Sequence, residues 1–334
     1  MPKVSIILPA FNAAVYLSAS IRSALAQTLT DFELLILDNA STDNTADVAA
    51  QFSDSRIRII RHPVNYGFGG NVARGLAMAQ GQYSAVLGAD DVWDSKFLER
   101  TIVFLDKHEH CSFVHTDAIW IDAESQPFGE SAAQWPKLSR GEDAFVNCFR
   151  DGFCFSALVL RSRTLAKAGG FEETWGPAGD LTLFLRLCLY GDAGFLAEPL
   201  VWYRHHSANL TSASFTSFSG SMLVLELQAL DLALGWPESS RLDRATARKL
   251  ALHYIAVRTL RMMHLLRIQR QRWNWLRTFF RSVSISPSVV LLPSTWARFG
   301  FGLLPRAAIL SLQRWKHARN SSRMREVSSV RSVP

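Results

Sequence analysis

Two adjacent aspartates, Asp90 and Asp91, end an apolar segment over residues 83–89. A buried strand that runs into paired acids places carboxylate oxygens at the edge of a sheet. Two carboxylates that lie close together repel each other unless a cation or strong hydrogen-bond donors neutralise them. Hard divalent cations such as Mg²⁺ and Mn²⁺ take carboxylate oxygens and share them with phosphate-bearing substrates. The pair therefore indicates a cation site, with a helix N-cap at Asp91 as the alternative.

The elements that position this pair follow a repeating order over the first 105 residues. Short β-rich runs alternate with segments whose apolar residues recur at helical spacing. Such β-α-β repeats form a parallel, doubly wound sheet whose ligands bind outside the carboxyl ends of the strands. Strands are predicted over residues 4–8, 32–37, 57–60 and 83–87, and helices over 17–25, from 41 onward and over 69–80, the first with Asn12 as its cap.

Polar residues gather where three of these strands end. Residues 9–12 follow the first strand, Asp38 and Asn39 follow the second, and Asp90-Asp91 follow the fourth. Because the carboxyl ends of parallel strands meet at one edge of a sheet, these segments are expected to converge into one site.

The later part of the chain changes character twice. From residue 106 to about 215 the patterns are mixed, with strands predicted over 112–115 and 155–160 and a helix from Asp180. Beyond about 216 the strand signals stop and long helical stretches follow. We therefore expect parts that span residues 1–105, 106–215 and 216–334.

The net charge of +7 hides a sharp division along the 334 residues. Residues 241–334 carry 19 Lys and Arg against two acids, a local charge of +17, whereas the first 240 residues carry −10. This asymmetry suggests an acidic catalytic or folding unit and a basic surface that attracts anions.

Cysteine usage and the first residues bear on the cellular compartment. The four cysteines lie in apolar surroundings without metal-binding spacing, which predicts reduced thiols in a cytosolic protein. Met1 leads within three residues into a strand, so we expect no signal peptide. The cysteines are Cys111, Cys148, Cys154 and Cys188.

The basic C-terminal part contains a candidate membrane-surface helix over residues 267–281. On a helical wheel four of its arginines cluster within an arc of about 80°, opposite bulky aromatic residues, and Arg272 is the exception. That arrangement is typical of a helix lying on anionic lipid; a helical subdomain packed on the core is the alternative. The later uncharged run over 282–297 is too short, and too interrupted by prolines, to be predicted as a transmembrane span. The tail after about residue 320 is expected to be disordered. The clustered arginines are Arg267, Arg270, Arg277 and Arg281, and the opposing side holds Ile268, Trp273, Trp275, Leu276, Phe279 and Phe280.

Taken together, these motifs resemble family 2 glycosyltransferases of the GT-A fold, of the type that builds bacterial surface polysaccharides. Several motifs occur in the family's order, strongly over residues 3 to about 120 and more patchily to 212. The resemblance implies an α/β fold with a doubly wound mixed sheet, a Rossmann-like nucleotide-sugar half and an acceptor half, here followed by a helical extension. The matching segments are Val4–Asn12, Gln27–Asp43, Asn65–Gly67, Ala79–Tyr83 and Asp90-Asp91.

The resemblance assigns the paired acids to a divalent ion, Mn²⁺ or Mg²⁺, which stabilises the diphosphate leaving group as a Lewis acid. Asp91 is then the direct metal ligand, and Asp90 faces the ribose or the donor sugar. The family's usual motif has a further acid two positions before the pair, where this chain has Gly88. We therefore expect a weakly held ion that arrives with the nucleotide.

A catalytic base is implied by the segment over residues 175–187. An acceptor hydroxyl must lose a proton as it attacks the anomeric carbon, which requires a carboxylate within hydrogen-bond reach. Asp180 matches the position where the family keeps this base, and an N-cap role for the same residue is compatible with it. A single base-assisted displacement predicts inversion at the anomeric carbon.

The nucleotide is expected to lie on the turn after the first strand and on the loop after the second. The family often has two aspartates where this chain has Asp38-Asn39. An asparagine can both accept and donate, so uridine is favoured while guanosine and thymidine stay open. Arg74 either reaches the phosphate or base or is a plain surface arginine. The expected nucleotide-sugar contacts are Pro9, Ala10, Phe11, Asn12, Asp38, Asn39, Arg74, Asp90 and Arg204.

The segment Tyr203–His206 resembles one that closes over the diphosphate in relatives. His206 would then ligate the metal and Arg204 would hold phosphate; an incidental histidine pair is the alternative. Tryptophans are further candidates for stacking on sugar rings, although apolar packing is the favoured interpretation for each of them. These are Trp93, Trp120, Trp135 and Trp175.

The combined prediction is an inverting, metal-dependent glycosyltransferase that uses a nucleoside-diphosphate sugar and extends a lipid-linked glycan. We expect it in the cytoplasm, held peripherally on the anionic inner face of the cell membrane. Nucleic acid is not an expected partner, because no recognisable nucleic-acid-binding motif accompanies the basic charge. The alternative is a nucleotide-sugar- or glycan-binding protein on the same fold that catalyses no transfer.

Overall fold

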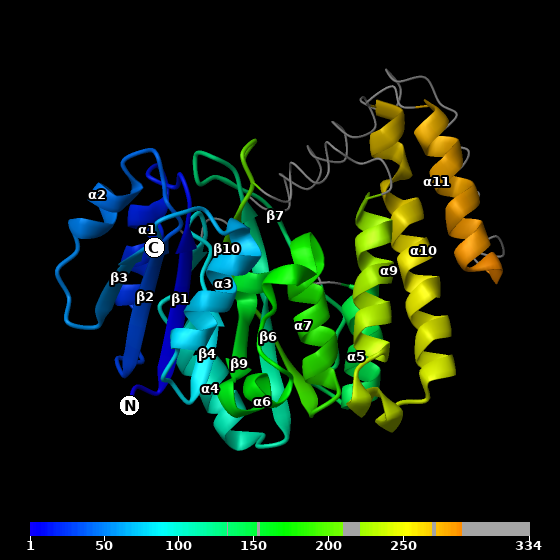
Figure 1. Ribbon diagram of the computed structural model, residues 1–334, viewed down its shortest axis with the longest axis horizontal. Coiled ribbons are helices and arrows are strands. Elements are labelled where there is room, and N and C mark those ends of the chain that lie inside the picture. Colours follow the sequence, from blue (N-terminus) through cyan, green and yellow to red (C-terminus); the bar gives the residue numbers. More distant parts are fainter. Residues whose placement is uncertain (132, 152–153, 210–220, 269–271, 289–334) are drawn as a thin grey trace. The chain divides into compact units, whose positions relative to one another are not determined.

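The computed structural model describes residues 1–131, 133–151, 154–209, 221–268 and 272–288. These residues divide into two compact units, Met1–His205 and a second unit that begins at His206. The first unit holds one continuous mixed sheet, and the described part of the second consists of helices (Figure 1).

The sheet of the first unit is parallel in its N-terminal half. The strand order is β3-β2-β1-β4-β9-β6-β10-β5. Strand β1 runs parallel to both β2 and β4, and β2 runs parallel to β3. The strands of this half are β1 (Val4–Ala10), β2 (Phe32–Asp38), β3 (Ile57–Arg61) and β4 (Tyr83–Val86), joined by the helices α1 (Leu17–Leu25), α2 (Thr45–Ala50) and α3 (Gly67–Met78).

The second half of the sheet attaches through an antiparallel strand. Strand β9 lies between β4 and β6 and is antiparallel to both, whereas β6 and β10 are parallel to each other. The strands here are β5 (Val92–Trp93), β6 (Cys111–Ile121), β7 (Pro127–Glu130), β8 (Leu138–Ser139), β9 (Leu158–Arg161) and β10 (Asp192–Arg204). The helices are α4 (Phe97–Lys107), α5 (Gly141–Arg150), α6 (Ser162–Lys167) and α7 (Gly179–Cys188), with short 3₁₀ turns η1 (Phe155–Ala157) and η2 (Glu173–Ala178).

Helices cover both faces of β1, and every residue of β1 and β2 is buried. Leu17 and Ile21 of α1 belong to one core cluster with Ile6 and Leu8. On α3, a Cβ added at Gly75 would lie 2.5 Å from Ile7 Cγ2. Glycine thus lets α3 approach the sheet closely. Two covered faces explain why these strands read as continuous apolar runs.

The expected doubly wound mixed sheet is confirmed, and local corrections fall at element ends. Helix α1 begins after Tyr16, so Asn12 is not its cap. The helix after the second strand begins at Thr45 rather than at residue 41. The strand expected over 155–160 begins at Leu158, because residues 155–157 form η1 and present the Ser156 hydroxyl to the loop after β4.

The second unit contains the helices α9 (Ser221–Leu234), α10 (Arg244–Ile268) and α11 (Arg272–Ile285), with η3 (Pro237–Arg241) between the first two. The predicted amphipathic segment 267–281 spans the end of α10 and the start of α11. Its residues 269–271 and the side chains of residues 260–278 lie outside the described part, as do residues 289–334 with the expected disordered tail.

Candidate active site

The loop after β2 is held by the buried carboxylate of Asp38. Its Oδ1 accepts a hydrogen bond from the Ser41 N–H at 3.0 Å. Its Oδ2 lies 3.3 Å from Nε of Arg61, at the end of β3. Ala40 adopts a left-handed φ of 58°, which reverses the chain directly after Asn39. The carboxyl ends of β2 and β3 are therefore tied together by one acid.

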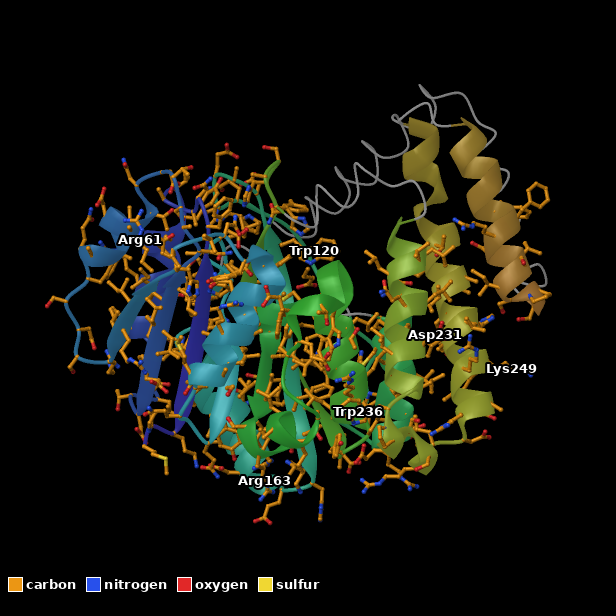
Figure 2. The ribbon with its side chains drawn as sticks, in the orientation of Figure 1. Arg61, Trp120, Arg163, Asp231, Trp236 and Lys249 are labelled. Atoms are coloured by element: carbon orange, nitrogen blue, oxygen red, sulfur yellow. The ribbon has the colours of Figure 1, made fainter. Side chains whose placement is uncertain are left out.

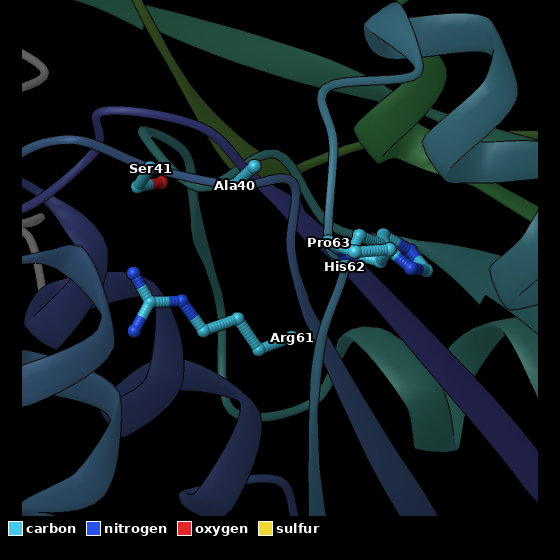
Figure 3. A pocket seen from close by; sticks show the side chains of 5 residues that line it. All are labelled: Ala40, Ser41, Arg61, His62 and Pro63. Carbon is cyan, nitrogen blue, oxygen red and sulfur yellow. The ribbon is translucent and has the colours of Figure 1, made fainter.

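A pocket of about 360 Å³ opens beside this loop. In Figure 3 the long side chain of Arg61 extends below the segment that carries Ala40 and Ser41. His62 and Pro63 complete the lining. The pocket thus lies at the strand ends where the sequence predicts the nucleotide, with a cation along one side.

Asn39 connects the loop after β2 to the loop before α3. Its Nδ2 donates to Asn65 Oδ1 at 2.9 Å and to the Gly67 carbonyl at 3.0 Å. Its Oδ1 accepts from the Tyr66 N–H at 2.9 Å. Both amide donors are thus used inside the protein. Any contribution of Asn39 to base recognition therefore depends on the second lone pair of Oδ1 or on the loops that it holds.

The turn after β1 packs against the same loop. Asn12 has a left-handed φ of 49°. Its N–H donates to Ser41 Oγ at 3.0 Å, and its Oδ1 accepts from the Thr42 N–H at 2.9 Å. The neighbouring Phe11 is 47% exposed, which leaves its ring accessible beside the loop. The turn after β1 and the loop after β2 therefore lie against each other at the strand ends, where the sequence predicts that they converge.

The carboxylate of Asp91 is buried and anchored on both oxygens. Oδ2 accepts from the Ser156 hydroxyl at 2.5 Å, and Oδ1 accepts from the Arg204 N–H at 2.9 Å. Ser156 Oγ in turn accepts from the Gly88 N–H at 3.0 Å. Helix α4 begins only at Phe97, with Lys96 at the cap position, so the N-cap alternative for Asp91 is wrong.

The two carboxylates converge on Gly88. Asp91 Oδ2 and Asp90 Oδ1 would lie 2.7 and 3.0 Å from a Cβ added at this position. Burial, followed by repulsion from Asp90, raises the pKa of Asp91 above its ordinary value, although the hydrogen bonds from Ser156 and Arg204 oppose the rise. A cation between the carboxylates would relieve this repulsion.

These acids fit a divalent ion in the chemistry of their donors. Carboxylate oxygens are the ligands that Mg²⁺ and Mn²⁺ take. Within the described residues there is no cluster of three or more His, Cys, Asp or Glu side chains suited to a metal. An ion held by Asp90 and Asp91 would therefore need oxygen ligands from water and from a phosphate-bearing substrate.

Replacing Gly88 by alanine tests this convergence. The new methyl group would meet Asp91 Oδ2 at 2.7 Å, below any normal contact. We expect displacement of the carboxylate, a loss of about 1–3 kcal/mol in the free energy of unfolding and reduced activity. Gly69→Ala is the matched control, because its nearest contact would be an ordinary 3.5 Å. Urea unfolding measures the stability of both variants, and a transfer assay measures their activity. A Gly88→Ala protein with wild-type stability and activity would contradict the packing argument.

Arg204 joins the acid pair to the second half of the unit. Its side chain is 2% exposed. Nε donates to the Asp90 carbonyl at 2.8 Å, and Nη1 donates to the Asp122 carbonyl at 3.0 Å and to Ser125 Oγ at 2.8 Å. The guanidinium also lies over the ring of Tyr16, 4.6 Å from its centroid. This residue, expected to hold phosphate, therefore fixes the backbone around Asp90.

Arg74 is engaged by other protein groups. Its Nη1 donates to Glu173 Oε2 of η2 at 2.8 Å, and its guanidinium stacks 3.5 Å above the centroid of Tyr66. These contacts fasten η2 to the start of α3. They also bring the segment that precedes Asp180 to the side of the sheet that carries the Asn39 loop.

Asp180 is the second residue of α7, and its Oδ1 accepts from the Leu181 N–H at 2.7 Å. Its carboxylate is half-buried. His206 is the first residue of the second unit, where its N–H donates to Asn209 Oδ1. The roles of Asp180 and His206 in the site are predictions.

Ser156 is the site residue that sequence reasoning missed. It lies 65 positions from Asp91, inside an apolar run that reads as a strand. A small polar residue in such a run is a weak signal, and its meaning depends on the pairing of β4 with β9. The contact is visible only in three dimensions.

The fold and the site define an α/β unit with acidic residues at the carboxyl ends of its parallel strands, and comparisons with known proteins identify its family. The family model for glycosyl transferase family 2 matches residues 5–170. An uncharacterized glycosyltransferase of Nostoc sp. is 33% identical over 223 residues, 64% of this chain and 69% of the relative. An Escherichia coli UDP-Glc:alpha-D-GlcNAc-diphosphoundecaprenol beta-1,3-glucosyltransferase is 40% identical over 112 residues, 34% of this chain and 44% of the relative.

Solved structures share the fold at low sequence identity. Staphylococcus aureus TarS 1-349 in complex with UDP-GlcNAc aligns with a TM-score of 0.63 at 15% identity, over 93% of this chain and 92% of that chain. The mannosyltransferase PcManGT of Pyrobaculum calidifontis, in complex with GDP-Man and Mn²⁺, aligns with a TM-score of 0.55 at 16% identity, over 94% and 79%. The chain belongs to glycosyltransferase family 2 and has the GT-A fold. It is a glycosyltransferase.

Proposed function

We propose that this glycosyltransferase moves a sugar from a UDP-sugar to a hydroxyl group of a lipid-linked glycan, with inversion at the anomeric carbon. The observation that carries the proposal is the convergence of Asp90 and Asp91 over Gly88 at the sheet edge that also holds the Asp38 loop. Binding of UDP-GlcNAc by TarS and the undecaprenol-linked acceptor of the E. coli relative support the donor and acceptor classes.

In this mechanism the protein groups bind and orient the donor. Residues 9–12 and the loop of Asp38 and Asn39 hold the nucleoside, while Asp90 faces the ribose or the donor sugar. Asp91, with Asp90 beside it, would hold a divalent ion, which would supply Lewis-acid stabilisation of the diphosphate charge. Arg204 keeps the Asp90 backbone fixed through its 2.8 Å hydrogen bond.

The proton of the acceptor hydroxyl passes to Asp180. As the new glycosidic bond forms, the bond between the anomeric carbon and the diphosphate oxygen breaks, and UDP leaves with that electron pair. The base acts on the face of the sugar opposite the leaving group, so the configuration inverts. A carboxylate base of this kind contributes about 10²–10⁴-fold to a rate.

A nucleotide screen tests the proposal. Thermal shifts are measured with UDP, GDP and TDP, each with and without Mn²⁺. We expect the largest shift with UDP plus Mn²⁺, since a ligand that binds the folded state raises its stability. Equal shifts with and without the ion would refute the metal role, and a larger shift with GDP would reassign the base. In a turnover assay, released UDP without acceptor-linked product would favour hydrolysis of the donor. Binding with no turnover on any donor would favour the non-catalytic alternative.

We also propose that the protein works at the cytoplasmic face of the cell membrane through its basic C-terminal part. The local charge of +17 over residues 241–334 supports attraction to anionic lipid. On α11, Phe280 is 65% exposed beside the exposed Arg281. None of the helices described here is long and apolar enough to cross a membrane.

Sedimentation with vesicles tests the membrane proposal. The fraction of protein that sediments with phosphatidylglycerol vesicles should fall as salt rises, with no binding to phosphatidylcholine vesicles or duplex DNA. Salt-independent or DNA binding would contradict the proposal.

A further inference from the structure

Trp120 differs from the other tryptophans considered for sugar stacking. Trp93, Trp135 and Trp175 are at most 5% exposed, in agreement with the expected apolar packing, whereas Trp120 is 38% exposed. Figure 2 shows Trp120 at the upper end of the sheet, the end to which β1 and β2 run. It is therefore an accessible indole at the carboxyl ends of the strands.

Trp120 is part of an aromatic cluster built on three neighbouring strands of the first unit. Its ring centroid lies 6.2 Å from that of Phe128 on β7 and 5.9 Å from that of His205. His205 also contacts the rings of Phe128, at 5.3 Å, and Tyr203, at 4.9 Å. Phe128 is 37% exposed. We call Trp120, Phe128, Tyr203 and His205 the aromatic platform.

The indole of Trp120 is supported from one side by a glycine. Trp120 pairs with Gly129 across β6 and β7. A Cβ at Gly129 would lie 2.7 Å from Cε3 of the indole and 3.4 Å from Cζ3. The six-membered ring therefore lies directly on the glycine backbone. Such cross-strand contact of an aromatic ring with glycine fixes the ring's orientation, so the exposed part of Trp120 belongs to a rigid surface.

The platform adjoins Arg204, which anchors the carboxylate of Asp91 and the backbone of Asp90. Tyr203 and His205 are the chain neighbours of Arg204, and consecutive Cα atoms are about 3.8 Å apart. Arg204 donates its N–H to Asp91 Oδ1 at 2.9 Å and its Nε to the Asp90 carbonyl at 2.8 Å. Tyr203 also pairs with Trp120 across β6 and β10. One stretch of β10 therefore serves both the acid pair and the platform.

We infer that the aromatic platform binds a sugar ring of the acceptor glycan, with the C–H face of a pyranose lying on Trp120. This inference rests on the proposed transfer to a glycan. An aromatic ring presents an apolar face, and Tyr and Trp combine that face with a polar edge that hydrogen-bonds. A pyranose has the matching surfaces, a face of C–H groups and a rim of hydroxyls.

A sugar is a better occupant of this surface than a protein partner. A stable protein interface buries about 800 Å² on each partner, and the platform offers two exposed rings, Trp120 and Phe128, with the part-buried rings of Tyr203 and His205 beside them. A single pyranose covers about one indole. The position next to Arg204 also suits an acceptor sugar, because an acceptor hydroxyl must reach the donor held by Asp90 and Asp91.

Saturation-transfer NMR with small probes tests the platform. The probes are the methyl glycosides of glucose, galactose, mannose and N-acetylglucosamine, each with and without UDP and Mg²⁺. We expect saturation of the ring C–H protons of at least one glycoside in the wild type and in Trp120→Phe. Trp120→Ala should bind about tenfold more weakly, the loss expected for one stacking contact. Gly129→Ala, which keeps Trp120 but pushes its ring away, should also weaken binding.

Controls separate this inference from the proposed function. Leu138→Ala removes another exposed apolar side chain, 46% exposed on β8, and should leave glycoside binding unaltered. UDP affinity, measured by calorimetry, should be equal in all variants. If the wild type binds no UDP, the proposed function fails. If UDP binds but no glycoside is saturated, or Trp120→Ala binds as the wild type does, the platform inference fails.

Discussion

Replacing Asp180 by asparagine is expected to slow glycosyl transfer by about 10²–10⁴-fold, the contribution of a positioned general base. An amide cannot take the proton that the acceptor hydroxyl loses. Asparagine keeps the Oδ1 that accepts from the Leu181 N–H at 2.7 Å, so the start of α7 should stay in place. The rate is measured in single turnovers with the donor that the nucleotide screen selects, and UDP affinity is expected to be unchanged.

The control for Asp180 is a nearby acid with a structural role. Glu173→Gln alters a carboxylate that is 49% exposed and pairs with Arg74, and it should retain most of the activity because exposed ion pairs contribute little. Thermal unfolding of both variants shows whether the fold survives. Full activity in a folded Asp180→Asn protein would place the catalytic base elsewhere.

The parallel half of the fold could be predicted because the sequence marks where its strands end. A strand buried on both faces is a continuous apolar run, and Asp38 or Asp90 stands out directly after such a run. The predicted end at residue 8 and the observed end at Ala10 differ because Pro9 reads as a break, although this proline stays within β1. Sheet pairing overrode that local signal.

The contacts that tune the site could not be predicted, because they join distant parts of the chain. Ser156 and Arg204 reach Asp91 across sequence separations of 65 and 113 residues. The family resemblance implies that Arg204 holds phosphate, whereas the sheet buries its guanidinium against carbonyl oxygens. In the sequence, Gly88 stands where the family's usual motif has an acid. In space it is the position over which two carboxylates meet.

Replacing Asp91 by asparagine should abolish metal-dependent nucleotide binding without unfolding the protein. Loss of one of two carboxylate ligands is expected to weaken ion-dependent UDP binding by more than about 100-fold. Asparagine has the same shape and can still accept from the Arg204 N–H, which Asp91 now does at 2.9 Å. Calorimetric titration of UDP with and without Mn²⁺ measures the loss. Asp94→Asn, in the turn between β5 and α4, is the control and should keep the wild-type Mn²⁺ dependence.

The same substitution should raise the stability of the metal-free protein. Burial and Asp90 raise the pKa of Asp91 above its ordinary 3.8, so the folded state holds the proton more tightly than the unfolded chain. Stability that depends on this proton is present at low pH and is lost as the pH rises above 3.8 toward the raised value. The amide of the variant does not titrate and would carry no such dependence. In EDTA the Tm of Asp91→Asn should therefore exceed that of the wild type by a margin that widens with pH, and Mn²⁺ with UDP should reverse the order. A wild-type protein more stable than the variant in EDTA at neutral pH would show that the two anchoring hydrogen bonds outweigh the buried charge.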